Sequence, residues 1–287
     1  MIKKLVFSSG TYYIFHQIKT INYFIKKEFF DIKNIEEIFC TSAGSISGLL
    51  LCIDIDFETI YQYILSRPWH KLFHLDASKI FNAYNNCGIY DIDIFKKGLE
   101  PLFKLKDISL DITLKELFLK SKKKLHIYST NTDTLEKTIF NYETTPDIKV
   151  FEAIYMSCSI PIIFKPMKFK NICYNDGAFS CRFPICEALE NTENSSEILG
   201  INVKVNRTAE NIDCKNLLTY MTSLTRKYAN NKILVYEQNN LKKVNIFHIN
   251  TNNSSLDDIY NMLTDISYRK ATLNNIEEEI ENYLNNL

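Results

Sequence analysis

One strand-to-helix transition constrains the fold of this chain more than any other feature. Residues 35–53 read IEEIFCTSAGSISGLLLCI, in which an apolar strand pattern over 35–40 passes almost directly into a helix that is apolar on most faces. A strand and a helix that are both largely apolar must be covered from several sides, which is typical of a parallel sheet wrapped by helices. Ser42 stands at the corner between the two elements.

The same alternation extends along the chain. IKKLVFS (2–8) reads as a buried first strand, and a helix follows it and ends near Glu28. Because neither a repeat nor a low-complexity linker is visible, we expect one α/β domain over residues 1–287. The other predicted elements are strands over 124–131 and 135–142, which can pair as a hairpin, strands over 170–174, 197–205 and 243–250, helices over 147–159 and 211–238, and one or two C-terminal helices.

Residues 57–122 interrupt this alternation. They are rich in aromatic residues and broken by RPWHKLFHLD and NNCGIYD, with short helical patterns between the breaks. A segment of this length between strands predicts a helical cap or a lid over a site. Its aromatic residues could line an acyl-chain pocket or contact a membrane surface, although packing against the body of the protein is the commoner explanation for such residues. The basic run KSKKK could likewise touch anionic lipid or simply end a solvated helix.

Composition excludes several classes of function. Thirty-four basic residues balance thirty-four acidic ones, so no nucleic-acid partner is expected. Eight cysteines are spread singly, without CxxC pairs or a Cys/His cluster, which predicts buried free thiols in a reducing compartment. No set of metal ligands is recognisable, and we expect neither a metal nor a cofactor.

The hydropathy pattern argues for a cytoplasmic protein, peripheral to membranes at most. Lys3 and Lys4 precede an apolar stretch, but that stretch has no continuous apolar core and no A-x-A cleavage site, so we expect no signal peptide. No run approaches the ~20 apolar residues that a membrane span requires.

The corner at Ser42 has the composition of a nucleophile turn. A nucleophilic serine needs a tight strand-to-helix turn, with small residues on both sides and backbone N–H groups nearby for an oxyanion. Ala43 and Gly44 meet this requirement after the serine, and Cys40 stands two places before it, where glycine is usual. The alternative is that Thr41 or Ser42 merely caps the following helix.

Two other short motifs could complete such a site. FSSGTYY offers the backbone of Ser9, Gly10 and Thr11 after the first strand, where N–H groups could face a tetrahedral intermediate. YNDGAFSCRFP places Asp176 and Gly177 after an apolar strand, where the carboxylate could accept the serine proton. Taken singly, each motif is more often an ordinary turn.

The order FSSG, CTSAG, SCSIPIIFKP and YNDGA resembles the patatin-like phospholipases. The resemblance covers roughly residues 4–50 and 125–190 and implies a three-layer α/β/α fold on a mostly parallel sheet. It also implies a serine–aspartate dyad that acts through an acyl-enzyme without a metal. Carried over to this chain, it assigns Ser42 as nucleophile, Asp176 as its base with Gly177 in the acid motif, Cys40 and Gly44 as the nucleophile elbow, and the backbone of Ser9, Gly10 and Thr11 as the oxyanion hole.

Departures from the family pattern cluster at the chemistry. Side chains replace two glycines of the first loop, Tyr13 stands where the family has a basic residue, and Arg182 replaces the usual Asn before Pro184. A lost oxyanion donor lowers a rate about 10²- to 10³-fold. Two functions therefore remain open: a phospholipase A-type lipid acyl hydrolase, or a catalytically reduced or inactive relative that binds lipid or a protein partner.

Two other nucleophile assignments compete with the dyad. Ser42, Asp176 and His248 occur in the chain order of the α/β-hydrolases, but only one predicted strand precedes residues 35–40, and His248 lies within a strand pattern. Cys40 is next to a helix N-terminus but lies in the strand rather than at the turn. We therefore expect Ser42 to be the nucleophile.

Overall fold

The computed structural model of this chain describes residues 1–287 except 191, 206–216, 232–243, 252–255 and 287. Its centre is an eight-stranded sheet in the order β10-β9-β1-β2-β4-β8-β7, with β5 paired to β4. The strands from β10 to β4 pair in parallel, whereas β5, β7 and β8 pair antiparallel. The strands are β1 (Lys4–Phe7), β2 (Glu37–Thr41), β4 (Lys124–Asn131), β5 (Lys137–Phe140), β7 (Met167–Phe169), β8 (Ile172–Asn175), β9 (Ile198–Val205) and β10 (Asn245–Thr251), and β3 (Gly88–Tyr90) pairs with β6 (Ile162–Phe164) in a separate small sheet.

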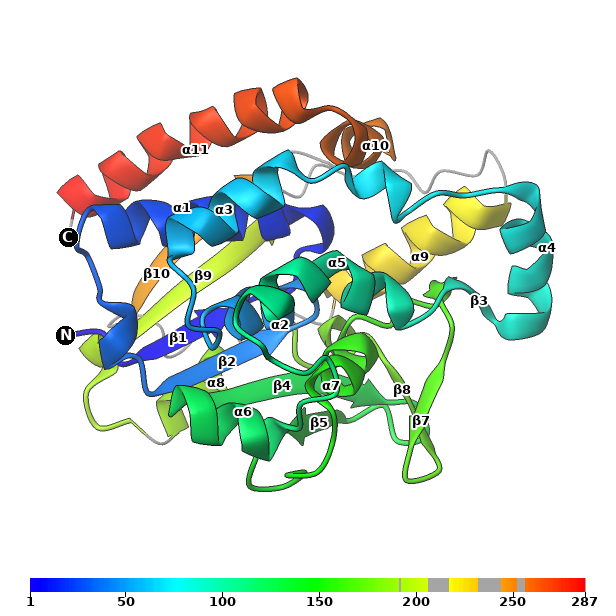
Figure 1. Ribbon diagram of the computed structural model, residues 1–287, viewed down its shortest axis with the longest axis horizontal. Helices are drawn as coiled ribbons and strands as arrows, with labels where there is room; N and C mark the ends of the chain where they lie inside the picture. The colour runs from blue at the N-terminus through cyan, green and yellow to red at the C-terminus, as the bar shows by residue number, and fades with distance from the viewer. Residues whose placement is uncertain (191, 206–216, 232–243, 252–255, 287) are drawn as a thin grey trace.

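Alternate side chains of the central strands enter two different cores, which makes the structure three-layered. Leu5 and Phe7 of β1 pack into the main core, whereas Val6 joins the core on the opposite face with residues of α8. Figure 1 shows α1, α3 and α11 stacked together along one side of the sheet. The helices are α1 (Ile14–Lys26), α2 (Ala43–Leu50), α3 (Phe57–Ser66), α4 (Ala77–Asn86), α5 (Asp93–Leu105), α6 (Leu114–Ser121), α7 (Val150–Ser157), α8 (Ile185–Glu190), α9 (Leu217–Asn231), α10 (Leu256–Thr264) and α11 (Ile266–Asn285).

The strand order brings the three predicted motifs to one edge of the sheet. β1 and β2 are parallel neighbours with Phe7 opposite Cys40, so the segments that follow them leave the sheet side by side. β8 runs antiparallel to β4 with Asn175 opposite Thr130, which directs the residue after β8 back toward the end of β2. The local sequence forms each strand, but the pairing sets where their ends meet.

Residues 57–122 are mostly helical, as predicted, but they also contain the strand β3, which was not predicted, and the helices divide into two parts. Ile60 of α3 and Phe103 of α5 belong to the main core, and α3 packs against α1 and α11. By contrast, α4 has no buried residue, and Figure 1 shows it at one end of the molecule beside β3. That residues 57–122 form a cap or lid over the site stays a prediction. Within this segment, α4 is the helix that does not pack into the core.

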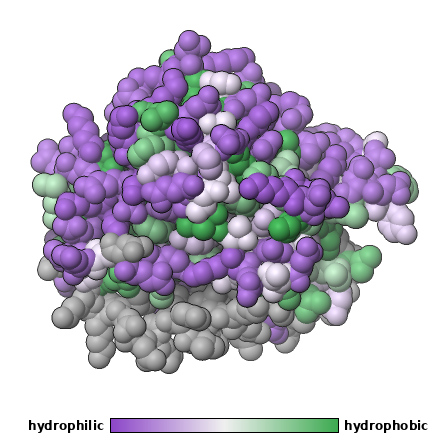
Figure 2. All heavy atoms as spheres, turned by 90° about the horizontal axis from the view of Figure 1, so that it is seen from below, coloured by the Kyte–Doolittle hydropathy of each residue, from purple (hydrophilic) through white to green (hydrophobic). Residues whose placement is uncertain are grey.

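Most predicted elements are confirmed, with shifts at their ends. The strand over 124–131 has those bounds, and it pairs antiparallel with β5 as the predicted hairpin. The helix predicted over 211–238 is observed over Leu217–Asn231, and its two ends lie outside the described residues. Within the described part of the chain, we find no helix both long and apolar enough to cross a membrane. On the face shown in Figure 2, hydrophilic residues predominate and hydrophobic ones form small separate groups.

Candidate active site

Ser42 alone makes the turn between β2 and α2. Its backbone has φ 54° and ψ −128°, a region that residues other than glycine rarely adopt and that strains the chain. The side chain makes no capping hydrogen bond; instead its Oγ donates to Asp176 Oδ2 over 2.6 Å. Thr41 Oγ1 donates to the carbonyl of Cys181 over 2.7 Å, so it does not cap the helix either. The alternative of a merely capping serine is therefore wrong.

The small residue after this turn is required by a close backbone approach. A Cβ atom at Gly44 would lie 2.6 Å from Ser8 O and 2.8 Å from Phe7 Cβ. Neither distance is tolerated, and the neighbouring atoms belong to the backbone or its first side-chain carbon. Gly44 therefore lets the start of α2 pack directly on the end of β1, which brings the first loop next to the serine turn.

Cys40 is accommodated because its side chain faces a second glycine of α2. The Cys40 thiol is fully buried and donates to the carbonyl of His126 over 3.2 Å. A Cβ atom at Gly48 would lie 3.3 Å from Cys40 Sγ, so the sulfur occupies the space that a side chain at Gly48 would need. Burial raises the pKa of the Cys40 thiol well above its ordinary value. The thiol is thus protonated and inaccessible, which excludes Cys40 as the nucleophile.

Asp176 directly follows β8, is only 3% exposed and is held rigidly by hydrogen bonds. Its Oδ1 accepts a hydrogen bond from the Ala178 N–H over 2.8 Å, and its own N–H donates to Ser159 O over 3.0 Å. Burial raises the pKa of the carboxyl to about 6, against the opposing effects of the hydrogen bonds from Ser42 and Ala178 and of the Arg182 charge. The carboxylate is therefore ionised at neutral pH yet is a better base than an exposed aspartate.

Gly177 permits the approach of this acid to the serine strand. A Cβ atom at this position would lie 2.2 Å from Tyr128 O and 2.8 Å from Thr41 Cγ2. Any larger residue would push the segment after β8 away from β2 and β4. The Asp-Gly pair is consequently not an ordinary turn, because its glycine packs against the two strands that support Ser42.

Buried serines fix the backbone of the serine turn. The Ser42 N–H donates to Ser157 Oγ over 2.8 Å, and Ser157 Oγ donates to Tyr128 O over 2.5 Å. On the other side, Ser45 Oγ donates to the Ser42 carbonyl over 2.5 Å. Sequence analysis did not identify Ser157 or Ser45. The available signal was the presence of small hydroxyl residues inside otherwise apolar helices, at the ends that face the same edge of the sheet.

The first loop meets the prediction only in part. The Ser9 N–H donates to the carbonyl of Arg182 over 2.9 Å, so the expectation that it serves an oxyanion hole is wrong. The Gly10 and Thr11 N–H groups donate to no acceptor among the described residues. Thr11 is exposed and has φ 48°, again in the left-handed region. Within the predicted loop, the amides of Gly10 and Thr11 therefore remain unengaged, and their role in an oxyanion hole stays a prediction.

Arg182, which looked like a departure, ties the acid segment to the first loop. Its carbonyl accepts the Ser9 N–H over 2.9 Å, and its Nη2 donates to Val203 O over 3.1 Å. Val203 N–H in turn donates to Ser8 Oγ over 2.8 Å. The segment after Asp176 and the loop after β1 thus form one hydrogen-bonded unit beside β9.

His248 lies far from Ser42 in the sheet. It is on β10, with its Nδ1 3.4 Å from Asn202 Nδ2 on β9. Strands β9 and β1 separate β10 from β2, and neighbouring strands lie about 4.8 Å apart. The triad alternative with His248 is therefore wrong.

The cysteines behave as free thiols. None of the seven described cysteines forms a disulfide with another, as predicted. Cys40, Cys52, Cys158 and Cys181 are buried, but Cys173 and Cys186 are only partly buried and Cys87 is exposed, so the prediction of buried thiols holds for four of the seven. Cys214 lies outside the described residues. Among the residues that the structure describes, no three His, Cys, Asp or Glu side chains are grouped so that they could hold a metal ion.

Comparisons with known proteins place this chain among related sequences and folds. A family model described as patatin-like phospholipase matches residues 5–189, a region that contains Ser42 and Asp176. A protein of Invertebrate iridescent virus 6 named "Probable lipid hydrolase 463L" is 34% identical over 161 residues, which are 55% of this chain and 55% of that protein. An uncharacterized protein of Acanthamoeba polyphaga mimivirus is 26% identical over 184 residues, which are 64% of this chain and 60% of that protein.

The similarity therefore spans little more than half the length of these curated relatives. Among solved structures, VipD from Legionella pneumophila superposes with a TM-score of 0.58 at 17% identity, over 99% of this chain and 67% of that one. At this identity the likeness is one of fold, and it covers the sheet, both helical layers and the C-terminal helices.

Proposed function

This chain belongs to the patatin-like phospholipase family, and on that premise we propose that it is a lipid acyl hydrolase of the phospholipase A type. Ser42 and Asp176 form its catalytic dyad. The observation that carries the proposal is the 2.6 Å hydrogen bond from Ser42 Oγ to Asp176 Oδ2, made by a serine in a strained turn. Strain of this kind persists only where the surrounding structure enforces it, and it is common at catalytic residues.

Acylation follows from the position of the proton. Ser42 Oγ bonds to the carbonyl carbon of the ester while its proton passes to Asp176 Oδ2, and the carbonyl electron pair moves onto oxygen. When the tetrahedral intermediate collapses, its C–O bond to the alcohol breaks and the departing oxygen takes the proton from Asp176. A carboxylate with a pKa of about 6 suits both steps, because it accepts a proton more readily than an exposed aspartate and still releases it.

The negative oxygen of that intermediate requires N–H donors beside Ser42. The Gly10 and Thr11 amides are the proposed donors, supported by the absence of any competing acceptor among the described residues. Ala43 begins α2, where the N–H groups of the first turn have no partner within the helix, so its amide is a third candidate. The α2 N-terminus adds partial positive charge at the same place.

Deacylation uses the same groups with water in place of the alcohol. Asp176 accepts a proton from the water, whose oxygen bonds to the acyl carbon, and collapse releases the fatty acid and returns the proton to Ser42. None of these steps requires a metal ion. The substrate class we propose is phospholipid or another lipid ester, reached while segment 57–122 contacts a membrane surface.

Labelling with a fluorophosphonate probe tests the dyad. The unmodified chain should be labelled, and both Ser42→Ala and Asp176→Asn should lose labelling, the first completely and the second by about 10³-fold or more. Ser47→Ala is the matched control, because Ser47 is a buried serine of the same helix whose Oγ donates to Gln17 instead of the acid. Release of fatty acid from phosphatidylcholine vesicles should follow the same order among the variants.

A folded chain that neither reacts with the probe nor releases fatty acid would contradict the proposal. It would favour the alternative of an inactive family member that binds lipid or a protein. One observation supports that alternative, namely that the Ser9 amide is occupied and the exposed Thr11 stands where a glycine loop is expected.

A further inference from the structure

The helix α4 has its polar and apolar sides reversed relative to an ordinary surface helix. Ala77, Ile80, Phe81 and Tyr84 recur at the spacing that places them on one stripe. Ile80 is 55% exposed, Phe81 79% and Tyr84 91%, so this stripe faces solvent. Scattered exposed hydrophobic residues are normal on a protein surface, but a continuous apolar stripe marks a surface that contacts something.

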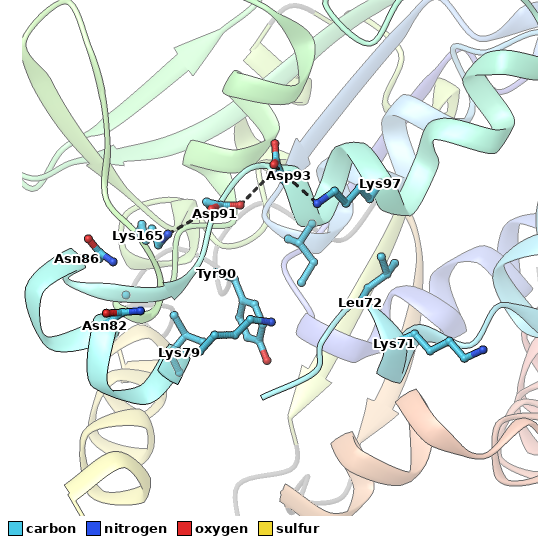
Figure 3. Close-up of a pocket in the computed structure, with 13 residues that line it drawn as sticks. Lys71, Leu72, Lys79, Asn82, Asn86, Tyr90, Asp91, Asp93, Lys97 and Lys165 are labelled. Carbon is cyan, nitrogen blue, oxygen red and sulfur yellow. Dashed lines mark hydrogen bonds and ion pairs between the residues drawn. The ribbon is translucent and has the colours of Figure 1, made fainter. Parts of the chain in front are cut away.

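The opposite side of α4 lines a pocket of about 390 Å³, whose walls are partly polar and partly apolar. Figure 3 shows Lys79, Asn82 and Asn86 of α4 on one side of this pocket, with Lys71 and Lys97 across it. A helix of this length that buries none of its residues gains little from packing and is marginal in water without a partner. The helix is thus turned so that its amide and lysine side faces the body of the protein and its apolar side faces outward.

Charge around the pocket favours an anionic partner. Four lysines line the pocket (Lys71, Lys79, Lys97 and Lys165), together with only two aspartates, Asp91 and Asp93. Lys165 pairs with Asp91 at 3.2 Å and Lys97 with Asp93 at 3.9 Å, so each aspartate is already engaged. Lys79 Nζ donates to His74 O over 2.7 Å, whereas Lys71 is exposed and has no carboxylate within 4.0 Å among the described residues. The lining of the pocket, on the polar side of α4, therefore carries two more positive than negative charges, and the Asp76 carboxylate that caps α4 reduces this excess to one.

We propose that α4 and the lysines of this pocket dock the protein on an anionic phospholipid membrane. The stripe of Ile80, Phe81 and Tyr84 enters the boundary between head groups and acyl chains, and the lysines contact phosphate and carboxylate groups above it. This inference deepens the proposed function, because a lipid hydrolase must meet its substrate at such a surface. A protein partner or a second copy of this chain would not require the positive charge that accompanies the stripe.

The docking element is joined to the segment that supports the dyad. β3 follows α4 directly and pairs with β6, with Tyr90 opposite Phe164. Tyr155 OH also donates to Lys165 O over 2.6 Å, which ties this small sheet to α7. The chain from α7 to β6 contains both Ser157, which holds the Ser42 amide, and Ser159, which holds the Asp176 amide. The docking element is therefore linked, through β3 and β6, to the segment that positions the catalytic groups.

Co-sedimentation with vesicles tests this inference, with Ser42→Ala as the parent so that no lipid is consumed. The parent should bind vesicles of phosphatidylcholine with phosphatidylserine, and should bind pure phosphatidylcholine vesicles much more weakly. Phe81→Ser combined with Tyr84→Ser should weaken binding at least about tenfold, because burial of one large apolar side chain exceeds the 1.4 kcal/mol that corresponds to tenfold. Lys71→Gln should weaken it about fivefold, with the loss disappearing at high salt.

Matched controls come from other surfaces of the chain. Leu119 and Leu135 are 54% and 56% exposed, so changing both to Ser tests loss of exposed apolar area away from α4. Lys33→Gln likewise removes an exposed charge beside an unrelated turn. These controls should bind like the parent. None of the α4 side chains is buried, so the melting temperature of the α4 variants should match that of the parent.

Three results would overturn the inference: equal binding by the parent and the α4 variant, equal binding to neutral and anionic vesicles, or a dimer in light scattering that the α4 variant abolishes while vesicle binding is absent. Its failure is separable from failure of the proposed function. A chain with intact Ser42 that hydrolyses a soluble ester but ignores vesicles contradicts only the docking surface. A chain that binds vesicles through α4 but is not labelled by the probe contradicts only the catalytic proposal.

Discussion

The turns after β1 and β2 are neighbours that both hold a backbone at positive φ, but their hydrogen bonding differs. Each contains a residue other than glycine at positive φ, Thr11 at 48° and Ser42 at 54°. Around Ser42 the amide, the carbonyl and the side chain are all engaged, by Ser157, Ser45 and Asp176. Around Thr11 the amide has no acceptor among the described residues.

The Ser42 turn is therefore fixed by hydrogen bonds, whereas the Thr11 amide is left unpaired. Ser42 is 5% exposed and cannot relax without breaking three hydrogen bonds, whereas Thr11 is exposed and its loop is held upstream by the Ser9 amide. A nucleophile must be fixed in direction, while an oxyanion donor must remain unpaired until substrate arrives. The two turns therefore have the complementary properties that acyl transfer requires.

Gly44→Ala should cause the largest loss of stability among these variants, because it forces the two turns apart. The new Cβ would lie 2.6 Å from Ser8 O, and we expect the free energy of unfolding to fall by about 3 kcal/mol and labelling by about 10²-fold. Gly98→Ala is the control. Gly98 lies within α5, and its new Cβ would make only ordinary van der Waals contacts, the nearest at 3.5 Å from Trp69. Urea denaturation and labelling rates should show that Gly98→Ala is neutral or slightly stabilising. If Gly44→Ala left stability and labelling unchanged as well, the close packing of the two turns would not matter for either property.

Asp176→Asn should stabilise the protein above neutral pH. The folded carboxyl has a pKa of about 6 against an ordinary value of 3.8, so the native state binds more protons than the unfolded chain between those pH values. The contribution of Asp176 to the free energy of unfolding thus falls as pH rises through that window, by about 3 kcal/mol at pH 8, because each pKa unit corresponds to about 1.4 kcal/mol. The variant should be more stable than the unmodified chain by this amount at pH 8 and equal to it below about pH 4.

The same ionisation should govern the rate. Labelling of the unmodified chain should rise with pH through about 6, because only ionised Asp176 can accept the serine proton. The labelling rate should be measured between about pH 4.5 and pH 8, limits that each lie a unit or more from the Asp176 pKa. A rate that does not change over this range would mean that Asp176 does not accept the Ser42 proton.

Ser157→Ala should loosen the serine turn without removing a reacting group. The variant leaves the buried Ser42 N–H without its acceptor, so we expect a loss of about 1.5 kcal/mol in unfolding free energy and about tenfold in labelling. Ser47→Ala also removes a buried hydroxyl from a hydrogen bond, but one to Gln17. Both variants should therefore lose stability in thermal unfolding, and only Ser157→Ala should lose labelling at a temperature where both are folded. Equal labelling by the two would mean that Ser157 has no positioning role.

Thr11→Gly should have the smallest effect. It tests whether the Thr11 side chain, held at positive φ in the first turn, contributes to the reaction. Glycine relieves the cost of φ 48° but adds freedom to the unfolded chain, for a net gain of about 0.5 kcal/mol. Labelling should be unchanged, because glycine keeps the backbone N–H. A large loss of labelling would instead assign a role to the Thr11 side chain, and the two turns would then be more alike than their hydrogen bonds indicate.

Much of the site was predictable because its motifs are local. Ser42 with Ala43 and Gly44 is recognisable as a tight strand-to-helix turn, and the Asp176–Gly177 pair follows an apolar strand. The positions that were predicted wrongly or missed depend on distant segments. Ser9 appeared free in sequence, but its amide belongs to Arg182, and Ser157 gave no sign of its bond to a residue 115 positions away.

Hydrophobic periodicity encodes the strands, the helices and their layered arrangement, because apolar spacing dictates which faces must be buried. The α/β class followed from that local information, whereas the proposed nucleophile and acid followed from the order of four motifs and the family resemblance that they carry. Tertiary pairing alone decided which donors are engaged, since β8 folds back along β4 to bring Asp176 within 2.6 Å of Ser42. It also decided that α4 turns its apolar stripe outward, because helical spacing defines a stripe but only packing determines which way it faces.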